Sequence, residues 1–177
     1  KGVTVAMDLP TAYQALEDIF NSCSQNLETK VVIEEFMEGE EASFFVLCNG
    51  QKLLPIGTAQ DHKRVGDGDT GPNTGGMGAY SPAPILTEKI EDSVIEEIIK
   101  PTLHEMERRG APYQGVLYAG LMIKDEKARL VEYNARFGDP ECQPLMMRLG
   151  AQVLDLLIAT SNGDLDECHI SWADDHA

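Results

Sequence analysis

The sequence contains few basic residues. Lysine and arginine together number 14, against 30 aspartates and glutamates, so the formal net charge is -16. Proteins that bind nucleic acids need a basic surface that displaces counterions from the phosphates. We therefore expect no nucleic-acid partner, although one basic cluster inside a cleft would still suit a small phosphorylated ligand.

Long apolar runs and metal-type cysteine spacings are absent as well. No run approaches the roughly 20 apolar residues of a membrane helix, and the N-terminus Lys1–Val5 is unlike a signal peptide. The four cysteines show no Cys-x-x-Cys spacing, which favours reduced thiols over a zinc site. We expect a cytoplasmic protein with no membrane partner.

The hydrophobic pattern predicts an α+β fold in which hairpins dominate and helices lie to the side. With 177 residues the chain is long enough for one sizeable core, or for two small subdomains that share one. The predicted strands are 3–7, 31–36, 43–48, 52–56, 115–123 and 128–137, and Asn49–Gly50 is a strong hairpin turn. The first predicted helix begins at Asp8 or Thr11. Three further helices are predicted at 87–109, 144–148 and 152–161.

Residues 65–84 are nearly all Gly, Asp, Pro, Thr and Asn, which predicts a loop without regular structure. A Walker loop needs Lys after its second glycine, but Met77 follows Gly76. A calcium loop needs an acid where Gly78 stands. A flexible surface loop and an anion-binding loop remain, and the basic segment Asp61-His62-Lys63-Arg64 directly before it favours phosphate recognition.

Two acidic segments carry further candidates. Glu132, Asn134 and Arg136 alternate along a predicted strand, so they share one face. A carboxylate and an amide oxygen suit Mg²⁺ on nucleotide phosphates, and the arginine suits a phosphoryl or acyl phosphate group. The plain alternative is the polar face of a half-solvated strand. The run from Glu34 to Glu41 is either an acidic strand end or a purine-binding hinge.

Two motifs are the most specific: Gly-Pro-Asn-Thr-Gly-Gly-Met-Gly-Ala-Tyr-Ser-Pro-Ala-Pro at 71–84 and Arg-Phe-Gly-Asp-Pro-Glu at 136–141. Together with the segments above, they resemble the glycinamide ribonucleotide synthetase (phosphoribosylamine–glycine ligase) family of ATP-grasp enzymes. The likeness extends over essentially all 177 residues and includes 32–36, 39–43, 60–64 and 118–122.

The resemblance implies a role for each matching residue. ATP would be bound by an adenine hinge of Glu34, Glu35, Phe36 and Met37, by Glu41 on the ribose, and by Lys63, Arg64 and Asn73. Glu132 and Asn134 would bind Mg²⁺ or Mn²⁺. The catalytic residues would be Arg136, Asp61 and His62, and the substrates would be held by Asp61, Arg136, Gly138 and Asp139. The strand at 120–123 lacks the additional acidic ligand of many ATP-grasp proteins.

The resemblance also implies an architecture and a reaction. Residues 1–36 would be part of the small ATP-grasp subdomain and 37–177 most of the large one, without the family's N-terminal and C-terminal domains. Glycine would be joined to 5-phosphoribosylamine at the expense of ATP, through glycyl phosphate. The alternatives are a fragment that binds nucleotide or folds without turnover, and another ATP-grasp carboxylate–amine ligase.

Overall fold

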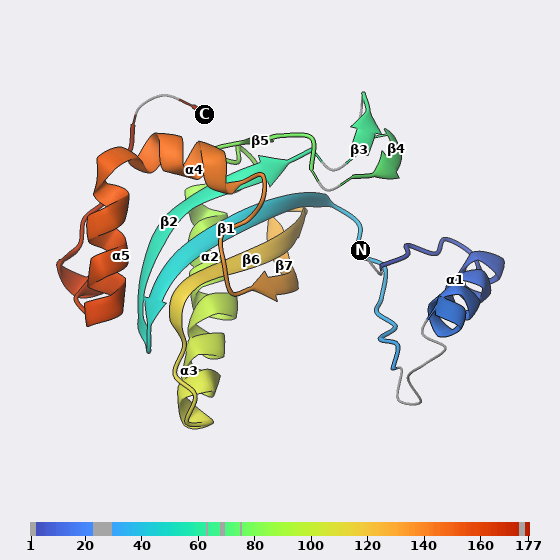
Figure 1. The fold of residues 1–177 in the computed structure, drawn as a ribbon, viewed down its shortest axis with the longest axis horizontal. Helices are drawn as coiled ribbons and strands as arrows, with labels where there is room; N and C mark the ends of the chain where they lie inside the picture. Colours follow the sequence, from blue (N-terminus) through green and yellow to red (C-terminus); the bar gives the residue numbers. More distant parts are fainter. Residues whose placement is uncertain (1–2, 23–29, 63, 68–69, 75, 174–175) are drawn as a thin grey trace. The chain divides into compact units, whose positions relative to one another are not determined.

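The structure is a computed structural model that describes residues 3–22, 30–62, 64–67, 70–74, 76–173 and 176–177. The chain divides into two compact units, residues 1–37 and residues 38–177, and each is described by itself. Figure 1 shows the elements of both units.

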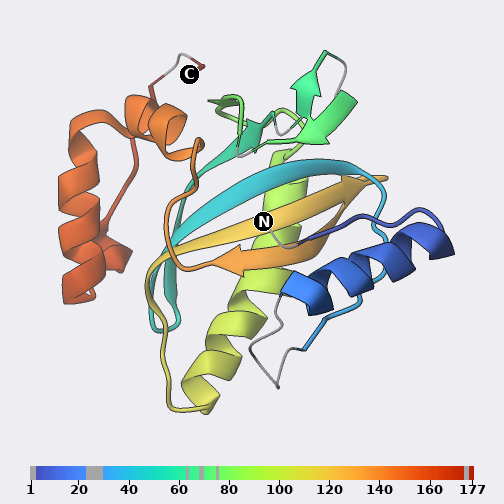
Figure 2. The same cartoon turned by 45° about the vertical axis from the view of Figure 1, so that its right-hand side comes forward.

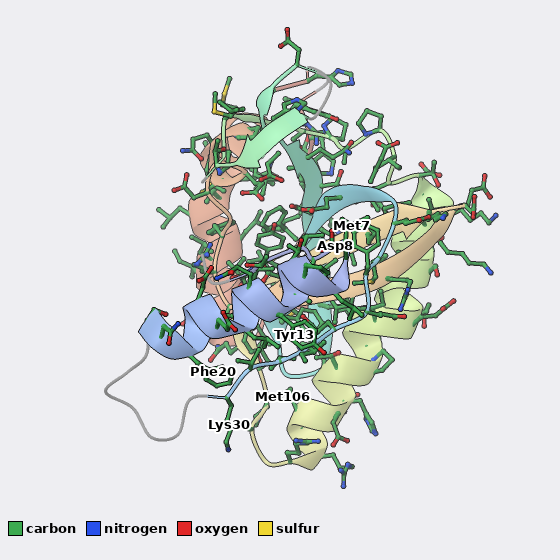
Figure 3. All side chains as sticks on the ribbon, turned by 90° about the vertical axis from the view of Figure 1, so that its right-hand side faces the viewer. Met7, Asp8, Tyr13, Phe20, Lys30 and Met106 are labelled. Atoms are coloured by element: carbon green, nitrogen blue, oxygen red, sulfur yellow. The ribbon has the colours of Figure 1, made fainter. Side chains whose placement is uncertain are left out.

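The first unit contains the helix α1 (Leu9–Ser22). The Asp8 carboxylate accepts a hydrogen bond from the Thr11 backbone N–H at 2.8 Å, which confirms Asp8 as the cap. Hydrogen bonding to the Thr11 side chain, and then to its backbone, lowers the pKa of Asp8. Tyr13 and Phe20 project from α1 (Figure 3), and they are 64% and 50% exposed. The helix has no buried residue.

The strands predicted at 3–7 and 31–36 are wrong, because the structure gives these residues no strand hydrogen bonding. A β-strand exists only where a neighbouring strand pairs with its backbone, and no described residue of the first unit forms one. Their apolar side chains are consequently exposed, with Val32 at 79% and Ile33 at 82%.

The second unit is built on a five-stranded antiparallel sheet with the order β5-β2-β1-β6-β7. Its strands are β1 (Glu40–Asn49), β2 (Lys52–Asp61), β5 (Ala79–Tyr80), β6 (Gln114–Lys124) and β7 (Lys127–Asn134). The predicted Asn49–Gly50 turn is confirmed, because Asn49 pairs with Lys52 and Gly50 has φ 61°. The segment 65–84 is not structureless: it contributes to the hairpin of β3 (Arg64–Gly66) and β4 (Thr70–Asn73), and it contains β5.

Strand β1 is buried from Ala42 to Cys48 because helices cover both faces of the sheet. One face carries a core built on Phe44, Val46 and Leu121. The other carries a core built on Phe45, Tyr118 and Leu145. Side chains alternate between the faces of a strand, so this unbroken apolar run supplies both cores at once.

The predicted helix 87–109 covers the first face as one rod with three parts, α2 (Glu88–Val94), η1 (Ile95–Ile99) and α3 (Lys100–Arg108). The middle part is a π-helix, and the Lys100 N–H bonds to the Ile95 carbonyl five residues back. Pro101 lies two residues after the end of this π-helix. A proline has no N–H to donate, and its ring displaces the carbonyl of the preceding turn. Figure 2 shows this rod crossing behind the strands.

The second face is covered by α4 (Cys142–Leu149) and α5 (Val153–Asn162), with short helical turns η2 (Gly150–Gln152) and η3 (Leu165–Glu167). Both helices were predicted, with α4 extending two residues earlier than expected. Their buried leucines, including Leu145, Leu149 and Leu156, fill the core against β1, β2 and β6.

Candidate functional site

The candidate site lies on the second face of the sheet, which we call the site face. Cross-strand partners point to the same side of a sheet. Ser43 on β1 pairs with Ala59 on β2 and with Gly120 on β6, and Gly120 pairs with Glu132 on β7. Glu41 lies two residues before Ser43, and pairs with Met122. Four neighbouring strands therefore contribute to one surface.

The structure brings Glu132 and Asn134 together. Their side chains share the site face, and the Asn134 Nδ2 lies 3.1 Å from the Glu132 Oε1. The pairing of β6 with β7 shifts register between Gly120 and Leu121, beside Glu132. Gly120 also leaves room for this side chain, since a Cβ there would lie 3.3 Å from the Glu132 Cγ. One carboxylate and one amide form an incomplete set of hard ligands, which fits Mg²⁺ that keeps phosphate and water oxygens.

Arg136 is not on the strand, which corrects the expectation that it shares a strand face with Glu132 and Asn134. Strand β7 ends at Asn134, and the chain bends over the next two residues. The exposed Arg136 guanidinium donates a hydrogen bond to the Phe137 carbonyl at 2.7 Å. The position of this cation therefore depends on the conformation of the turn that follows the strand.

Asp61 and His62 stand where β2 ends. Asp61 pairs with Ala79 of β5 and is half-buried. His62 is exposed; its backbone N–H bonds to the Gly78 carbonyl, and its carbonyl accepts from the Met77 N–H. These two bonds hold Met77 and Gly78, which belong to the glycine-rich loop 65–84, beside Asp61.

The same loop contacts the turn after β7. A Cβ on Gly76 would lie 2.5 Å from the Pro140 Cδ, and the residue has φ 121°. Only glycine meets both conditions without strain. Backbone of the loop therefore approaches Asp139 and Pro140, two residues of the Arg-Phe-Gly-Asp-Pro-Glu motif.

Several predicted ATP residues are not placed against this site. Lys63 lies outside the described residues, and Arg64 and Asn73 are described only as the paired ends of β3 and β4. Glu34, Glu35, Phe36 and Met37 belong to the first unit, and the first three are exposed. Their assignment to an adenine hinge stays a prediction. Glu41 is exposed on the site face.

Sequence reasoning missed a buried polar cluster on the site face. Ser43, Tyr118 and Glu141 are 2%, 7% and 3% exposed. Tyr118 donates to the Glu141 Oε1 at 3.0 Å, and the Ser43 hydroxyl lies 2.9 Å from the Tyr118 oxygen and 3.2 Å from the same carboxylate oxygen. Burial is the main cause that raises the pKa of Tyr118. The sequence signal was that Ser43, Tyr118 and Glu141 all belong to the matching segments.

Gly138, predicted to bind substrate, is buried and has a different reason to be glycine. A Cβ there would lie 2.4 Å from the Glu141 Oε2. The glycine therefore makes room for the buried carboxylate. Asp139, the other predicted substrate residue of this turn, is exposed.

Other features of the described residues lie away from this site. Cavities of about 420 and 430 Å³ occur beside Ile85 and Lys124 and between α3 and β7. Among the described residues, no cluster of three or more His, Cys, Asp or Glu is arranged to hold a metal. Cys48, Cys142 and Cys168 are free thiols. Among the described residues, no helix has the length and apolarity needed to cross a membrane.

Known proteins match the whole chain. The family model described as the ATP-grasp (A) domain of phosphoribosylglycinamide synthetase matches residues 1–142. A phosphoribosylamine–glycine ligase of Brucella melitensis is 54% identical over 177 residues, and the chloroplastic ligase of Arabidopsis thaliana is 52% identical over 184. The match covers 100% of this chain in both cases, but only 42% and 34% of those two proteins.

Solved structures agree with the sequence relatives. The phosphoribosylamine–glycine ligase of Thermotoga maritima superposes with a TM-score of 0.75 at 32% identity, over 86% of this chain and 39% of that one. A biotin carboxylase of Campylobacter jejuni, with a TM-score of 0.56 at 14% identity over 87% of this chain and 31% of that one, shares the fold alone. The expected α+β, partial ATP-grasp fold is confirmed, and the chain belongs to the family of phosphoribosylglycinamide synthetase ATP-grasp (A) domains.

Proposed function

We propose that this chain carries the ATP site of an enzyme that ligates glycine to 5-phosphoribosylamine, giving glycinamide ribonucleotide, ADP and phosphate in purine biosynthesis. The observation that carries the proposal is the 54% identity, over the whole chain, with a phosphoribosylamine–glycine ligase. The chain spans about two fifths of that relative's length, 42%. The further domains of such an enzyme are therefore its expected partners, with the two small-molecule substrates.

The reaction has two steps. The glycine carboxylate attacks the γ-phosphorus of ATP, which forms glycyl phosphate and releases ADP. The amine of 5-phosphoribosylamine then attacks the acyl carbon, loses a proton and displaces phosphate. Positioning and charge neutralisation account for most of such catalysis, so no side-chain nucleophile is required.

The residues of the site face have roles that fit this chemistry. Glu132 and Asn134 would hold Mg²⁺ or Mn²⁺, which when bound neutralises charge on the phosphates. Arg136 would stabilise the acyl phosphate from the turn after β7, together with Asp61, His62 and Asp139 on the substrate side. The main-chain N–H groups of the glycine-rich loop, with Lys63, Arg64 and Asn73, would face the ATP phosphates. We propose the cytosol as the site of action.

Nucleotide binding without turnover by these 177 residues is the second candidate, favoured by the 42% share of the relative's length. Calorimetry with ATP and Mg²⁺, beside an assay of ADP release in the presence of both substrates, distinguishes the two. Binding with no ADP release supports the second candidate. Substrate-dependent ADP release supports ligation, and release with other carboxylates in place of glycine supports a different ligase.

The magnesium assignment is tested by Glu132→Ala. We expect the affinity for ATP in the presence of Mg²⁺ to fall at least about tenfold, because one of two protein ligands is lost. The matched control is Glu88→Ala, which removes an exposed carboxylate at the start of α2 and should leave the affinity unchanged. In EDTA the three proteins should bind ATP alike. Equal affinity of Glu132→Ala and the unsubstituted chain for Mg²⁺-ATP would contradict the assignment.

A further inference from the structure

The cluster of Ser43, Tyr118 and Glu141 joins three elements that meet beneath the site. Ser43 lies on β1, Tyr118 on β6, and Glu141 directly precedes α4. All three side chains are at least nine-tenths buried. A buried carboxylate is costly unless donors satisfy it, so both hydroxyls matter to Glu141.

The phenol of Tyr118 is held in its donating form. A phenol is protonated at neutral pH even at its ordinary pKa, burial raises the pKa of Tyr118 further, and the hydroxyl donates to the Glu141 Oε1. The Phe45 ring, with its centroid 4.7 Å from that of Tyr118, packs against the phenol from the same face. Tyr118 therefore occupies a fixed position between the sheet and the carboxylate.

This carboxylate fixes the turn that carries the substrate-side candidates. Gly138 leaves the space that the Glu141 carboxylate fills. The Gly138 carbonyl accepts from the Cys142 N–H at 3.2 Å, and the Glu141 carbonyl accepts from the Leu145 N–H at 3.3 Å. The turn is therefore held to the start of α4 by backbone hydrogen bonds and to the sheet by the Glu141 carboxylate. Its Pro140 packs close to Gly76 of the loop.

Tyr118 also connects the turn to the metal candidates: it bonds to Glu141 of the turn, and it pairs with Asn134 across β6 and β7. We propose that Ser43, Tyr118 and Glu141 form a positioning network that holds the turn 136–141, and with it Arg136 and Asp139, at a fixed place beside Glu132 and Asn134. Their role in the reaction rests on the proposed function. Gly138 then leaves the space that this network needs, and its predicted contact with the substrate stays a prediction.

The network is first tested without any activity. Hydrogen–deuterium exchange is measured on the 177-residue chain and on Tyr118→Phe, Glu141→Gln and Ser43→Ala. We expect the amides of Cys142, Gln143 and Leu145 to exchange about tenfold faster in the first two variants, and to a smaller extent in the third.

The matched control is Tyr133→Phe, which removes a hydroxyl that bonds to Thr102 and Ile98 on the opposite face of the same sheet. Its exchange at the turn should stay unchanged. If the turn exchanges alike in Tyr118→Phe and Tyr133→Phe, the network does not hold it and the proposal is overturned.

The positioning role is tested by placing these 177 residues in the Brucella melitensis ligase, in exchange for the matching segment. We expect Tyr118→Phe to lower kcat at least about tenfold and to leave the KM for ATP within about twofold, since the misplaced groups act on the acyl phosphate side. Tyr133→Phe should change neither. Equal kcat values in the two variants overturn the role, whereas an inactive unsubstituted chimera contradicts the proposed function and leaves the exchange result standing.

Discussion

At the scale of single residues, different glycines of the second unit are required for different physical reasons. Gly76 and Gly39 combine a positive φ with a close neighbour, whereas Gly50 has a positive φ and open space around it. Gly138 has a close neighbour, the Glu141 carboxylate, and its φ lies outside the positive range. The sequence shows that a residue is glycine, but only the packed structure shows which of these conditions it meets.

This distinction predicts different costs for the same substitution. A Cβ on Gly39 would lie 2.4 Å from the Ile123 carbonyl oxygen, which is backbone and cannot move alone. Gly39→Ala should therefore lower the free energy of unfolding by about 2–4 kcal/mol, the sum of strain at positive φ and overpacking. Gly50→Ala, the control, bears only the cost of its φ of 61°, about 1 kcal/mol. Urea unfolding measures both, and equal losses would contradict the argument.

At the scale of elements, prediction succeeded where local chemistry decides the structure. The Asp8 cap, the Asn49–Gly50 turn and the helical stripes of α4 and α5 all depend on neighbours in sequence. The π-helical turn at 95–99 was not predicted, because a stripe of Ile and Val fits both helix types. The strands at 3–7 and 31–36 failed because β-structure depends on a partner strand.

The link between the rod α2–η1–α3 and the sheet gives a prediction at this scale. The Thr102 hydroxyl donates to the Ile98 carbonyl at 2.8 Å and lies 2.8 Å from the Tyr133 hydroxyl of β7. Thr102→Val keeps the shape and loses these bonds, so we expect a loss of about 1–2 kcal/mol of unfolding free energy.

Ser93→Ala is the control for this prediction, because its hydroxyl donates to Glu97 on the exposed side of the same rod. It should change the unfolding free energy by less than about 0.5 kcal/mol. Urea midpoints that coincide for the two variants would show that the hydroxyl of Thr102 contributes nothing to the joint between helix and sheet.

At the scale of the whole molecule, the candidate site shows where sequence reasoning ends. The period of two placed Glu132 and Asn134 on one face, and the structure agrees. It misplaced Arg136, because no local signal marks the end of β7 at Asn134. The Ser43–Tyr118–Glu141 network was invisible because its members lie 75 and 23 residues apart in sequence. Contacts between distant elements follow from the fold, not from local pattern.

The buried sheet also fixes how stability changes with pH. Burial raises the pKa of the Cys48 thiol to about 12, and it raises the pKa values of the Tyr118 and Tyr133 hydroxyls as well. In the unfolded chain these groups ionise near their ordinary values, about 8.5 for Cys and about 10 for Tyr. Their contribution is therefore fully present below those values, and it is lost as the pH rises towards the folded-state pKa values.

We accordingly expect the free energy of unfolding to decrease between pH 8 and pH 10.5, with about 2 kcal/mol of the decrease due to Cys48. Urea unfolding of the chain and of Cys48→Ala at both pH values separates this part. The variant is less stable at pH 8 because it leaves a cavity, yet its stability should decrease less on the way to pH 10.5. An identical decrease in both proteins would show that the thiol does not ionise on unfolding as its burial requires, and that the alkaline loss comes from the tyrosines alone.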